Sequence, residues 1–185
     1  MTKAQLTVLA GPTAVGKGTV VAALTKRYPA LKVSVSATTR DPRPGELSGV
    51  HYYFVSPQEF DAMIERGDML EWALVHGKNK YGTPRGPVDE ALNAGHPVLL
   101  EIDLAGARQV RANRPDAQFI FLAPPSWEEL QRRLIGRGTE GPEEQARRLA
   151  TARVELQAAS EFDHVVINDD VERAVDELAR LIGLE

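Results

Sequence analysis

The residues with the most distinctive chemistry lie in the run GPTAVGKGT, from Gly11 to Thr19. Gly11 and Gly16 lack a Cβ, so backbone N–H groups between them can turn inward around an anion. Lys17 places a full positive charge next to these donors. The spacing predicts a phosphate-binding loop between a strand and a helix, although Gly18 stands where Ser or Thr usually follows the lysine and Thr19 then supplies the hydroxyl. The alternative is a glycine-rich turn without a ligand.

Arginines gather in two further places. Arg40 and Arg43 lie in a proline-broken loop, where two guanidinium groups could grip one phosphate, and solvated loop charges are the alternative. A second set flanks a glycine-rich break between two predicted helices: Arg132, Arg133, Arg137, Arg147, Arg148 and Arg153. This set suits a hinged flap that brings cations over a transferring phosphoryl group. Exposed helix faces are the alternative, which we favour for Arg132, Arg147 and Arg153.

Three carboxylates stand in apolar surroundings. Glu101 and Asp103 lie two apart at the end of a predicted strand, so we expect them to share a face. One of them could reach Mg²⁺ through water, and the other a polar ligand. Glu71 lies in the apolar run Met69-Leu70-Glu71-Trp72. A carboxylate accepts from two adjacent donors, such as N1–H and N2–H₂ of guanine, whereas adenine presents an acceptor at N1.

Composition narrows the class of protein. The chain has 185 residues, 43% of them hydrophobic and 26% charged, with a net charge of −4. These values suit one α/β domain and argue against a surface built for nucleic acid or membrane. The absence of cysteine excludes disulfides, thiolate catalysis and Cys-ligated zinc, and the four histidines show no ligand spacing. With neither a membrane-length apolar run nor a signal-like N-terminus, we expect a cytoplasmic protein.

Strand and helix signals alternate along the chain. We expect strands at about 6–9, 32–36, 52–55, 69–75, 97–103, 117–122 and 164–167. We expect helices at about 18–27, 57–66, 87–93, 105–113, 127–134, 143–159 and 170–182, with Ser56 and Ser126 as N-caps. This alternation predicts an α/β fold with a central parallel sheet. The aromatic stretch 38–86 departs from it and predicts an inserted lobe near the carboxyl ends of the strands, where ligands bind in such sheets.

The order of several segments resembles guanylate kinase of the bacterial type, a nucleoside monophosphate kinase of the P-loop class. The matching segments are GPTAVGKGT, SATTRDPRPGE, HYYFVS, EW followed by YGT, EIDLAGA, RLIGRGTE followed by RRL, and VINDD. The resemblance covers nearly the whole chain. It implies a three-layer P-loop fold in one domain, 1–185, with a core of 1–37, 87–134 and 143–185, a GMP-binding lobe at 38–86 and a helical lid at 135–142.

The resemblance also implies roles for individual residues. ATP phosphates would lie on the loop residues Gly11, Pro12, Thr13, Ala14, Val15, Gly16, Lys17, Gly18 and Thr19. GMP would contact Ser36, Arg40, Arg43, Tyr52, Glu71, Tyr81, Thr83 and Asp103, with Ser36, Glu71 and Asp103 reading the base. Arg133, Arg137 and Arg148 would close over the polyphosphate, and Asn168 would lie near adenine. The predicted catalytic groups are Lys17, Arg43, Arg137 and Arg148, and the predicted metal contacts, through water, are Thr19 and Glu101.

The implied reaction is transfer of the γ-phosphoryl group of MgATP to GMP or dGMP, giving ADP and GDP, by a monomer or small homo-oligomer. Two alternatives stay open: another nucleoside monophosphate kinase, and a non-catalytic module of similar fold that binds peptides. A regulatory GTPase is disfavoured because the chain has no Asn-Lys-x-Asp segment. The sequence departs from the family in a turn before Tyr81 that is one residue longer, and in Leu104-Ala105-Gly106, where Trp-Gln-Gly is common.

Overall fold

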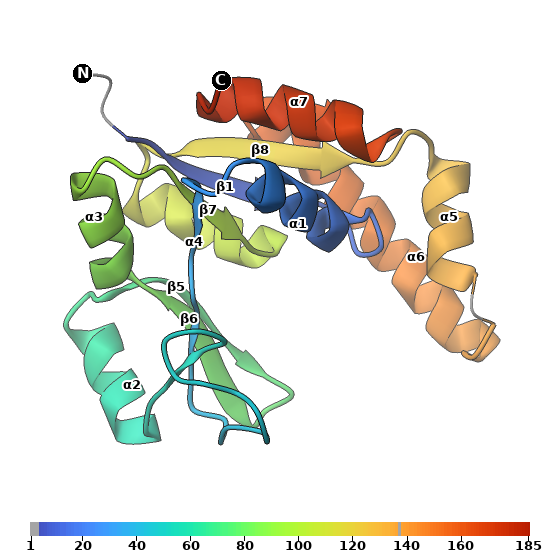
Figure 1. Cartoon of the computed structure of the whole chain (residues 1–185). Helices are drawn as coiled ribbons and strands as arrows, with labels where there is room; N and C mark the ends of the chain where they lie inside the picture. Colours follow the sequence, from blue (N-terminus) through green and yellow to red (C-terminus); the bar gives the residue numbers. More distant parts are fainter. Residues whose placement is uncertain (1–3, 137) are drawn as a thin grey trace.

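The computed structural model describes residues 4–136 and 138–185 and contains two sheets (Figure 1). The larger sheet has the strand order β2-β7-β1-β8-β9, and every neighbouring pair in it is parallel. Its strands are β1 (Leu6–Ala10), β2 (Lys32–Val33), β7 (Val98–Glu101), β8 (Gln118–Ala123) and β9 (His164–Ile167). The predicted α/β fold with a central parallel sheet is therefore confirmed.

Helices cover both faces of the large sheet and make three layers. One face packs against α1 (Lys17–Arg27) and α7 (Val171–Ile182), and the other against α3 (Arg85–Asn93) and α4 (Leu104–Asn113). The central strands β1 and β8 are buried along their whole length, as expected for parallel strands covered on both faces. The sheet is thus a rigid base, and its strand ends hold the loops that carry charge.

The second sheet lies in the inserted segment and hangs below the core in Figure 1. Its strand order is β4-β3-β6-β5, with bounds β3 (Ala37–Thr38), β4 (Tyr53–Phe54), β5 (Met69–Val75) and β6 (Asn79–Pro84). Helix α2 (Pro57–Glu65) packs on it through Phe60, which is fully buried. As predicted, Ser56 caps this helix, and its hydroxyl accepts a hydrogen bond of 3.1 Å from the backbone N–H of Glu59.

Three predicted elements were wrong in detail. The strand expected at 32–36 ends at Val33, because the chain leaves the large sheet there and enters β3 of the small one. The stretch 76–83, where no strand was expected, contains β6, which pairs with both β5 and β3 although its residues do not alternate in polarity. The strand expected at 97–103 ends at Glu101, so Asp103 does not share a strand with it and instead caps α4.

Helices α5 (Trp127–Ile135) and α6 (Pro142–Gln157) project beyond the sheet (Figure 1). They pack together through Leu130, Leu134 and Ala152, and the segment expected to form a lid lies between them in the sequence. A 3₁₀ turn, Ala158–Glu161, follows α6. Among the described residues, no helix combines the length and apolar character needed to cross a membrane.

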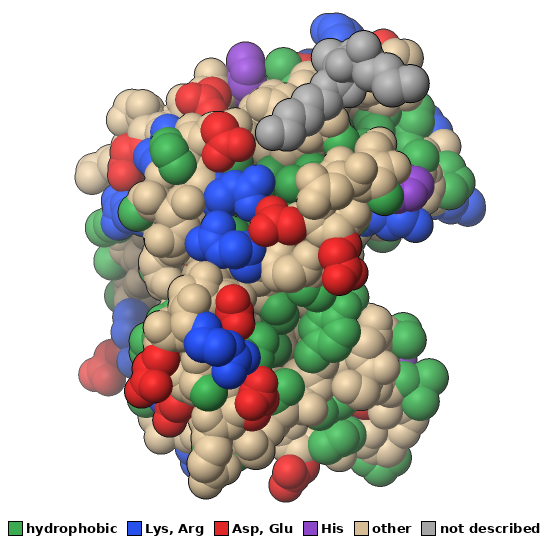
Figure 2. Space-filling model, turned by 90° about the vertical axis from the view of Figure 1, so that its left-hand side faces the viewer, with side chains coloured by type: hydrophobic (Ala, Val, Ile, Leu, Met, Phe, Trp, Pro, Cys, Tyr) green, Lys and Arg blue, Asp and Glu red, His purple; other side chains and the backbone are tan. Residues whose placement is uncertain are grey.

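The surface shown in Figure 2 carries basic and acidic side chains close to one another, and it is hollowed at one side between the core and the inserted lobe. This face is therefore not uniformly basic. The mixed charge agrees with the small net charge of the chain.

Candidate active site

The glycine-rich loop connects β1 to α1 and has the backbone shape of an anion cradle. Ala14 has φ 70° and Gly16 has φ 91°, a left-handed conformation that favours glycine at the second position. Gly16 is also the N-cap of α1, so the unpaired N–H groups of the first turn face the loop. The predicted strand, loop and helix therefore occur in the expected order.

The two framing glycines are needed for close packing as well. A Cβ on Gly11 would lie 2.5 Å from the carbonyl oxygen of Leu122, and a Cβ on Gly16 would lie 2.9 Å from Nδ2 of Asn168. Asn168 is buried, and its Nδ2 donates a hydrogen bond of 2.8 Å to the carbonyl oxygen of Val15. The Arg133 guanidinium donates to the same oxygen at 2.9 Å. Arg133 and Asn168, which were both predicted to contact ATP, thus hold the backbone of the loop at Val15.

Lys17 lies at the carboxyl end of β7. Its Nζ donates a hydrogen bond of 3.0 Å to the carbonyl oxygen of Ile102. Burial lowers the pKa of the Lys17 ammonium, and the carboxylates of Glu101, Asp103 and Glu155 oppose this shift. The lysine is therefore held among acidic groups at the strand ends, where a phosphate would compete for its charge.

The region beside Lys17 also bears on metal binding. Glu101 is half-buried, and its Oε1 would lie 3.9 Å from a Cβ on Gly18, so this carboxylate faces the first turn of α1, which includes Thr19. Across residues 4–136 and 138–185, no group of three or more His, Cys, Asp or Glu side chains could hold a metal ion. Mg²⁺ commonly binds through one or two carboxylates together with substrate phosphates and water. The donor set at Glu101 and Thr19 fits an ion that arrives with a nucleotide.

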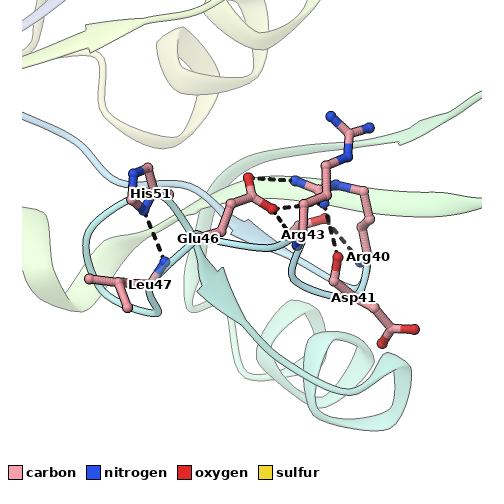
Figure 3. Close-up of polar contacts among 7 residues, drawn as sticks. Arg40, Asp41, Arg43, Glu46, Leu47 and His51 are labelled. Atoms are coloured by element: carbon pink, nitrogen blue, oxygen red, sulfur yellow. Dashed lines mark hydrogen bonds and ion pairs between the residues drawn. The ribbon is translucent and has the colours of Figure 1, made fainter.

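The loop that carries Arg40 and Arg43 is organised by Glu46 (Figure 3). The Arg40 guanidinium binds both carboxylate oxygens of Glu46, at 2.9 and 3.0 Å, and the backbone N–H of Arg43 donates to Oε1 at 2.7 Å. The bond from Arg40 is the main cause that lowers the pKa of Glu46 to about 2. The Arg43 guanidinium points away from Glu46 (Figure 3). Sequence reasoning gave Glu46 no role, although it lies three residues after Arg43.

Two tyrosines lie beside this loop. The Arg40 guanidinium is 5.3 Å from the ring centroid of Tyr52, and the Tyr52 and Tyr81 rings meet edge to face at 5.9 Å. The hydrogen bond to Glu46 is the main cause that raises the pKa of Arg40, and contact with the Tyr81 side chain adds to it. The structure therefore brings Arg40, Tyr52 and Tyr81 together, with Arg43 in the same loop, and the longer turn before Tyr81 does not displace Tyr81 from Arg40.

Glu71 lies on β5, opposite Thr83 of β6. The buried Thr83 hydroxyl donates a hydrogen bond of 2.8 Å to Oε1 of Glu71. Burial raises the pKa of the Glu71 carboxyl; the bond from Thr83 opposes that shift, and the charge of Asp103 adds to it. The Asp103 carboxylate is not free to turn, because its Oδ1 accepts a bond of 2.8 Å from the Gly106 N–H. Ser36 lies half-buried just before β3.

The lid side of the molecule contains a cavity of about 370 Å³ that opens beside the glycine-rich loop, and its lining includes Thr13, Ala14, Arg133 and Arg148. Arg148 forms ion pairs with Glu140 at 2.7 Å and with Glu144 at 3.5 Å. Arg137 was predicted to act here, and it lies outside the described residues.

The other arginines of this set have structural neighbours. Arg132 pairs with Glu129, and Arg147 with Glu144, on exposed helix surfaces. The Arg153 guanidinium stacks over the Trp127 ring at 4.2 Å. The exposed-face alternative is confirmed for Arg132 and Arg147.

Glu155 is a further acidic residue that sequence reasoning missed. Burial raises the pKa of its carboxyl, while the backbone N–H of Thr13 and the charge of Lys17 oppose that shift. The residue stands seven positions after Arg148, which is two helical turns and the same face of α6. The spacing from Arg148, a predicted site residue, was therefore a sequence signal that Glu155 lies on the same side of α6.

Comparisons with known proteins agree with this geometry. Residues 3–185 match the family model described as guanylate kinase. The chain is 62% identical over 177 residues to a guanylate kinase from Leifsonia xyli subsp. xyli, covering 96% of this chain and 70% of that protein. It is 61% identical over 179 residues to a guanylate kinase from Thermobifida fusca, covering 97% and 91%.

Solved structures give the same answer. The crystal structure of guanylate kinase from Anaplasma phagocytophilum superimposes with a TM-score of 0.70 at 32% identity, covering 97% of this chain and 85% of that one. Shikimate kinase from Bacteroides thetaiotaomicron matches with a TM-score of 0.51 at 14% identity, covering 97% of this chain and 98% of that one. The second likeness shows the fold alone.

Proposed function

The chain belongs to the guanylate kinase family, and we propose how its own residues carry out the ATP-dependent phosphorylation of GMP. The observation that carries the proposal is the position of Asp103. It follows Ile102, whose carbonyl oxygen binds Lys17 of the glycine-rich loop. A Cβ on Gly106 would lie 3.1 Å from both Oδ1 of Asp103 and Oε2 of Glu71 in the inserted lobe. In this proposal, the phosphate end of one nucleotide site and the base end of the other meet at the start of α4.

ATP would bind with its phosphates on the loop 11–19. The N–H groups at the start of α1 and the Lys17 ammonium would take up the negative charge. The Val15 carbonyl oxygen accepts hydrogen bonds from Arg133 and Asn168, so this acceptor of the loop is already paired when the phosphates bind. When bound through Glu101 and Thr19, Mg²⁺ would neutralise charge on the phosphates.

GMP would bind in the lobe, with its phosphate against Arg40, Arg43, Tyr52 and Tyr81. Glu46 fixes the Arg40 fork and leaves the Arg43 guanidinium available. A planar guanidinium fork suits the oxygens of a phosphate group. The acceptor is then a phosphate oxygen that is already anionic, so transfer needs no strong general base.

The base would be read by Glu71. Thr83 donates to Oε1 of this carboxylate, which still has acceptor capacity for the N1–H and N2–H₂ donors of guanine. Ser36 would contact O6, and Asp103 would contribute from the core. Adenine presents an acceptor at N1. This acceptor would face the Glu71 carboxylate, which is also an acceptor, so adenine would be rejected.

Catalysis would then rest on position and charge. Lys17, Arg43, Arg137 and Arg148 would surround the transferring phosphoryl group and stabilise its charge as the two nucleotides align. Closure of the lobe and of the lid segment 135–142 would exclude water and prevent ATP hydrolysis. Arg148 would exchange its carboxylate partners Glu140 and Glu144 for phosphate oxygens. We place this activity in the cytoplasm, in a monomer or small homo-oligomer.

A coupled assay of ADP formation tests the proposal. GMP, dGMP, AMP, UMP and CMP are supplied in parallel with ATP and Mg²⁺. We expect ADP with GMP and dGMP, and little above the ATP-only background with the others. Turnover of AMP or UMP equal to that of GMP would favour a different nucleoside monophosphate kinase. ADP formation that no monophosphate increases would favour the non-catalytic binding module, which the intact loop and Lys17 argue against.

A further inference from the structure

The strand that carries Glu71 lies at an open edge of the small sheet. In the order β4-β3-β6-β5, strand β5 is terminal and pairs with β6 alone. Trp72 pairs with Gly82 across that ladder, yet both backbone polar groups of Trp72 bind a side chain of α4. An edge strand presents a row of such groups that need partners. At this edge, a helix of the core supplies them.

The partner is Gln109, through both ends of its carboxamide. Its Oε1 accepts from the Trp72 backbone N–H at 3.0 Å, and its Nε2 donates to the Trp72 carbonyl oxygen at 2.9 Å. One turn further along α4, Nδ2 of Asn113 donates to the Leu70 carbonyl oxygen at 2.9 Å. Two amide side chains therefore bind the backbone on either side of Glu71 and take the place of a neighbouring strand.

The same face of α4 approaches the Glu71 carboxylate directly. Gly106, Gln109 and Asn113 follow one another at spacings of three and four, which places them on one side of the helix. A Cβ on Gly106 would lie 3.1 Å from Oε2 of Glu71. The helix can lie this close because position 106 has no side chain. The ladder between β5 and β6 also shifts register between Met69 and Glu71, and such irregularities re-aim side chains near active sites.

We propose that Gln109 is a positioning residue for guanine recognition, because its carboxamide fixes the Trp72 backbone and so aims the Glu71 carboxylate at the edge of the base. This inference rests on the proposed function of Glu71. The hydrogen bond from Thr83 restrains Oε1 from the lobe side, and Gln109 restrains the strand from the core side. A displacement of about 1 Å in such a site costs on the order of 100-fold in rate.

The proposal separates specificity from stability. IMP has the O6 and N1–H of GMP and lacks the N2 amine, so the preference for GMP over IMP reports how well the Glu71 carboxylate meets the second donor. If Gln109 aims Glu71, its loss lowers that preference. If Gln109 only attaches the lobe to the core, its loss lowers the melting temperature and leaves the preference as it was.

The test uses Q109M in the full chain. Methionine has a similar length and can neither donate to the Trp72 carbonyl nor accept from its N–H as an amide does. We expect KM for GMP to rise by about tenfold, the GMP-over-IMP ratio of kcat/KM to fall by about tenfold, and KM for ATP to stay within about twofold. Q58M, on the exposed surface of α2 in the same lobe, is the matched control and should leave all three values unchanged.

A second variant and a double variant complete the test. Q109E keeps the acceptor for the Trp72 N–H and loses the donor to the Trp72 carbonyl, so it should also lower the GMP-over-IMP ratio. It provides the test if Q109M does not fold. Adding Q109M to E71Q should lower the GMP-over-IMP ratio no further, since both act through one carboxylate. A folded Q109M or Q109E enzyme with the wild-type ratio overturns the proposal. A wild-type protein without GMP kinase activity would instead overturn the proposed function.

Discussion

The Lys17 ammonium is anchored to the backbone just after β7: Nζ donates to the carbonyl oxygen of Ile102 at 3.0 Å. Ile102 stands between Glu101 and Asp103, so the bond places the lysine at the carboxyl end of β7 and not in open solvent. This relationship ties the glycine-rich loop to the start of α4. It also means that the lysine has a definite resting position from which it can turn to a phosphate.

Replacement of Lys17 by methionine should abolish turnover and preserve the fold. Removing one group that stabilises transition-state charge costs about 10² to 10³ in kcat, and we expect at least that loss. Burial lowers the pKa of the lysine, so the charged form is disfavoured there and a neutral side chain of similar length should not unfold the chain. Coupled assay and thermal melting measure the two effects. The control is K26M, an exposed residue on the same helix, and an active K17M enzyme would refute the role.

Glu71→Gln should trade specificity for stability. The folded-state pKa of Glu71 is raised, chiefly by burial. Its contribution to stability is therefore complete below the unfolded pKa of about 4.3 and is lost as pH rises through the higher folded value. At pH 8, the melting temperature of E71Q should exceed that of wild type by a few degrees, the shift that corresponds to about 1 kcal/mol of stability. The difference in melting temperature should vanish near pH 4.

The same substitution should lower kcat/KM for GMP by about 100-fold or more, since an amide nitrogen cannot accept from the base. Steady-state kinetics with GMP and thermal melts at pH 4 and 8 measure both effects in one variant. A melting difference that is the same at both pH values would contradict the assignment of the cost to the buried charge.

Short-range patterns were sufficient for part of this molecule. The glycine-rich loop was predictable because its strand, glycines and lysine are contiguous, and the parallel sheet followed from alternation of apolar strands with helices. Strand β6 was missed because Asn79 and Lys80 show no alternation; it forms a hairpin with β5, which ends at Val75, and also pairs with the distant β3. Asp103 was placed on a strand because the apolar run reaches it, whereas its side chain caps a helix.

The supporting residues of the site were harder to find. Glu46 and Gln109 act on neighbours whose positions depend on the tertiary fold. A carboxylate near two arginines suggests a pair, but only the folded loop shows that Glu46 also accepts from the Arg43 backbone. An amide on a helix gives no signal at all until the open edge of β5 is known.

Glu46→Gln should weaken GMP binding without changing ATP binding. The amide would turn a donor toward the Arg40 guanidinium and break the two-pronged pair. We expect KM for GMP to rise by about tenfold, with KM for ATP unchanged. E65Q, exposed on α2 of the same lobe, is the matched control. Equal rises in both KM values would argue for a general loss of structure.

The pH dependence of GMP binding should distinguish Glu46 from Glu71. The pKa of Glu46 is lowered to about 2, so its pairing is present above the unfolded value of about 4.3 and is lost only as pH falls through about 2. The pKa of Glu71 is raised, so as pH falls its carboxylate is protonated and loses its charge at a higher pH than Glu46 does. GMP affinity should therefore fall with acid more steeply in wild type than in E71Q between pH 8 and pH 4, because E71Q keeps only the titration of the GMP phosphate, whose second pKa is about 6. A profile that E71Q leaves unchanged would assign the titration to another group.

Gly106→Ala separates local helix stability from the geometry of the site. Position 106 lies within α4, where alanine is favoured over glycine by about 1 kcal/mol. Its Cβ would meet Oδ1 of Asp103 and Oε2 of Glu71, each at 3.1 Å, so both carboxylates must give way by a few tenths of an ångström. We expect the melting temperature to hold or rise while KM for GMP increases several-fold. General destabilisation would lower the melting temperature instead. A fall in melting temperature together with an unchanged KM for GMP would mean that Glu71 does not depend on the close approach of α4.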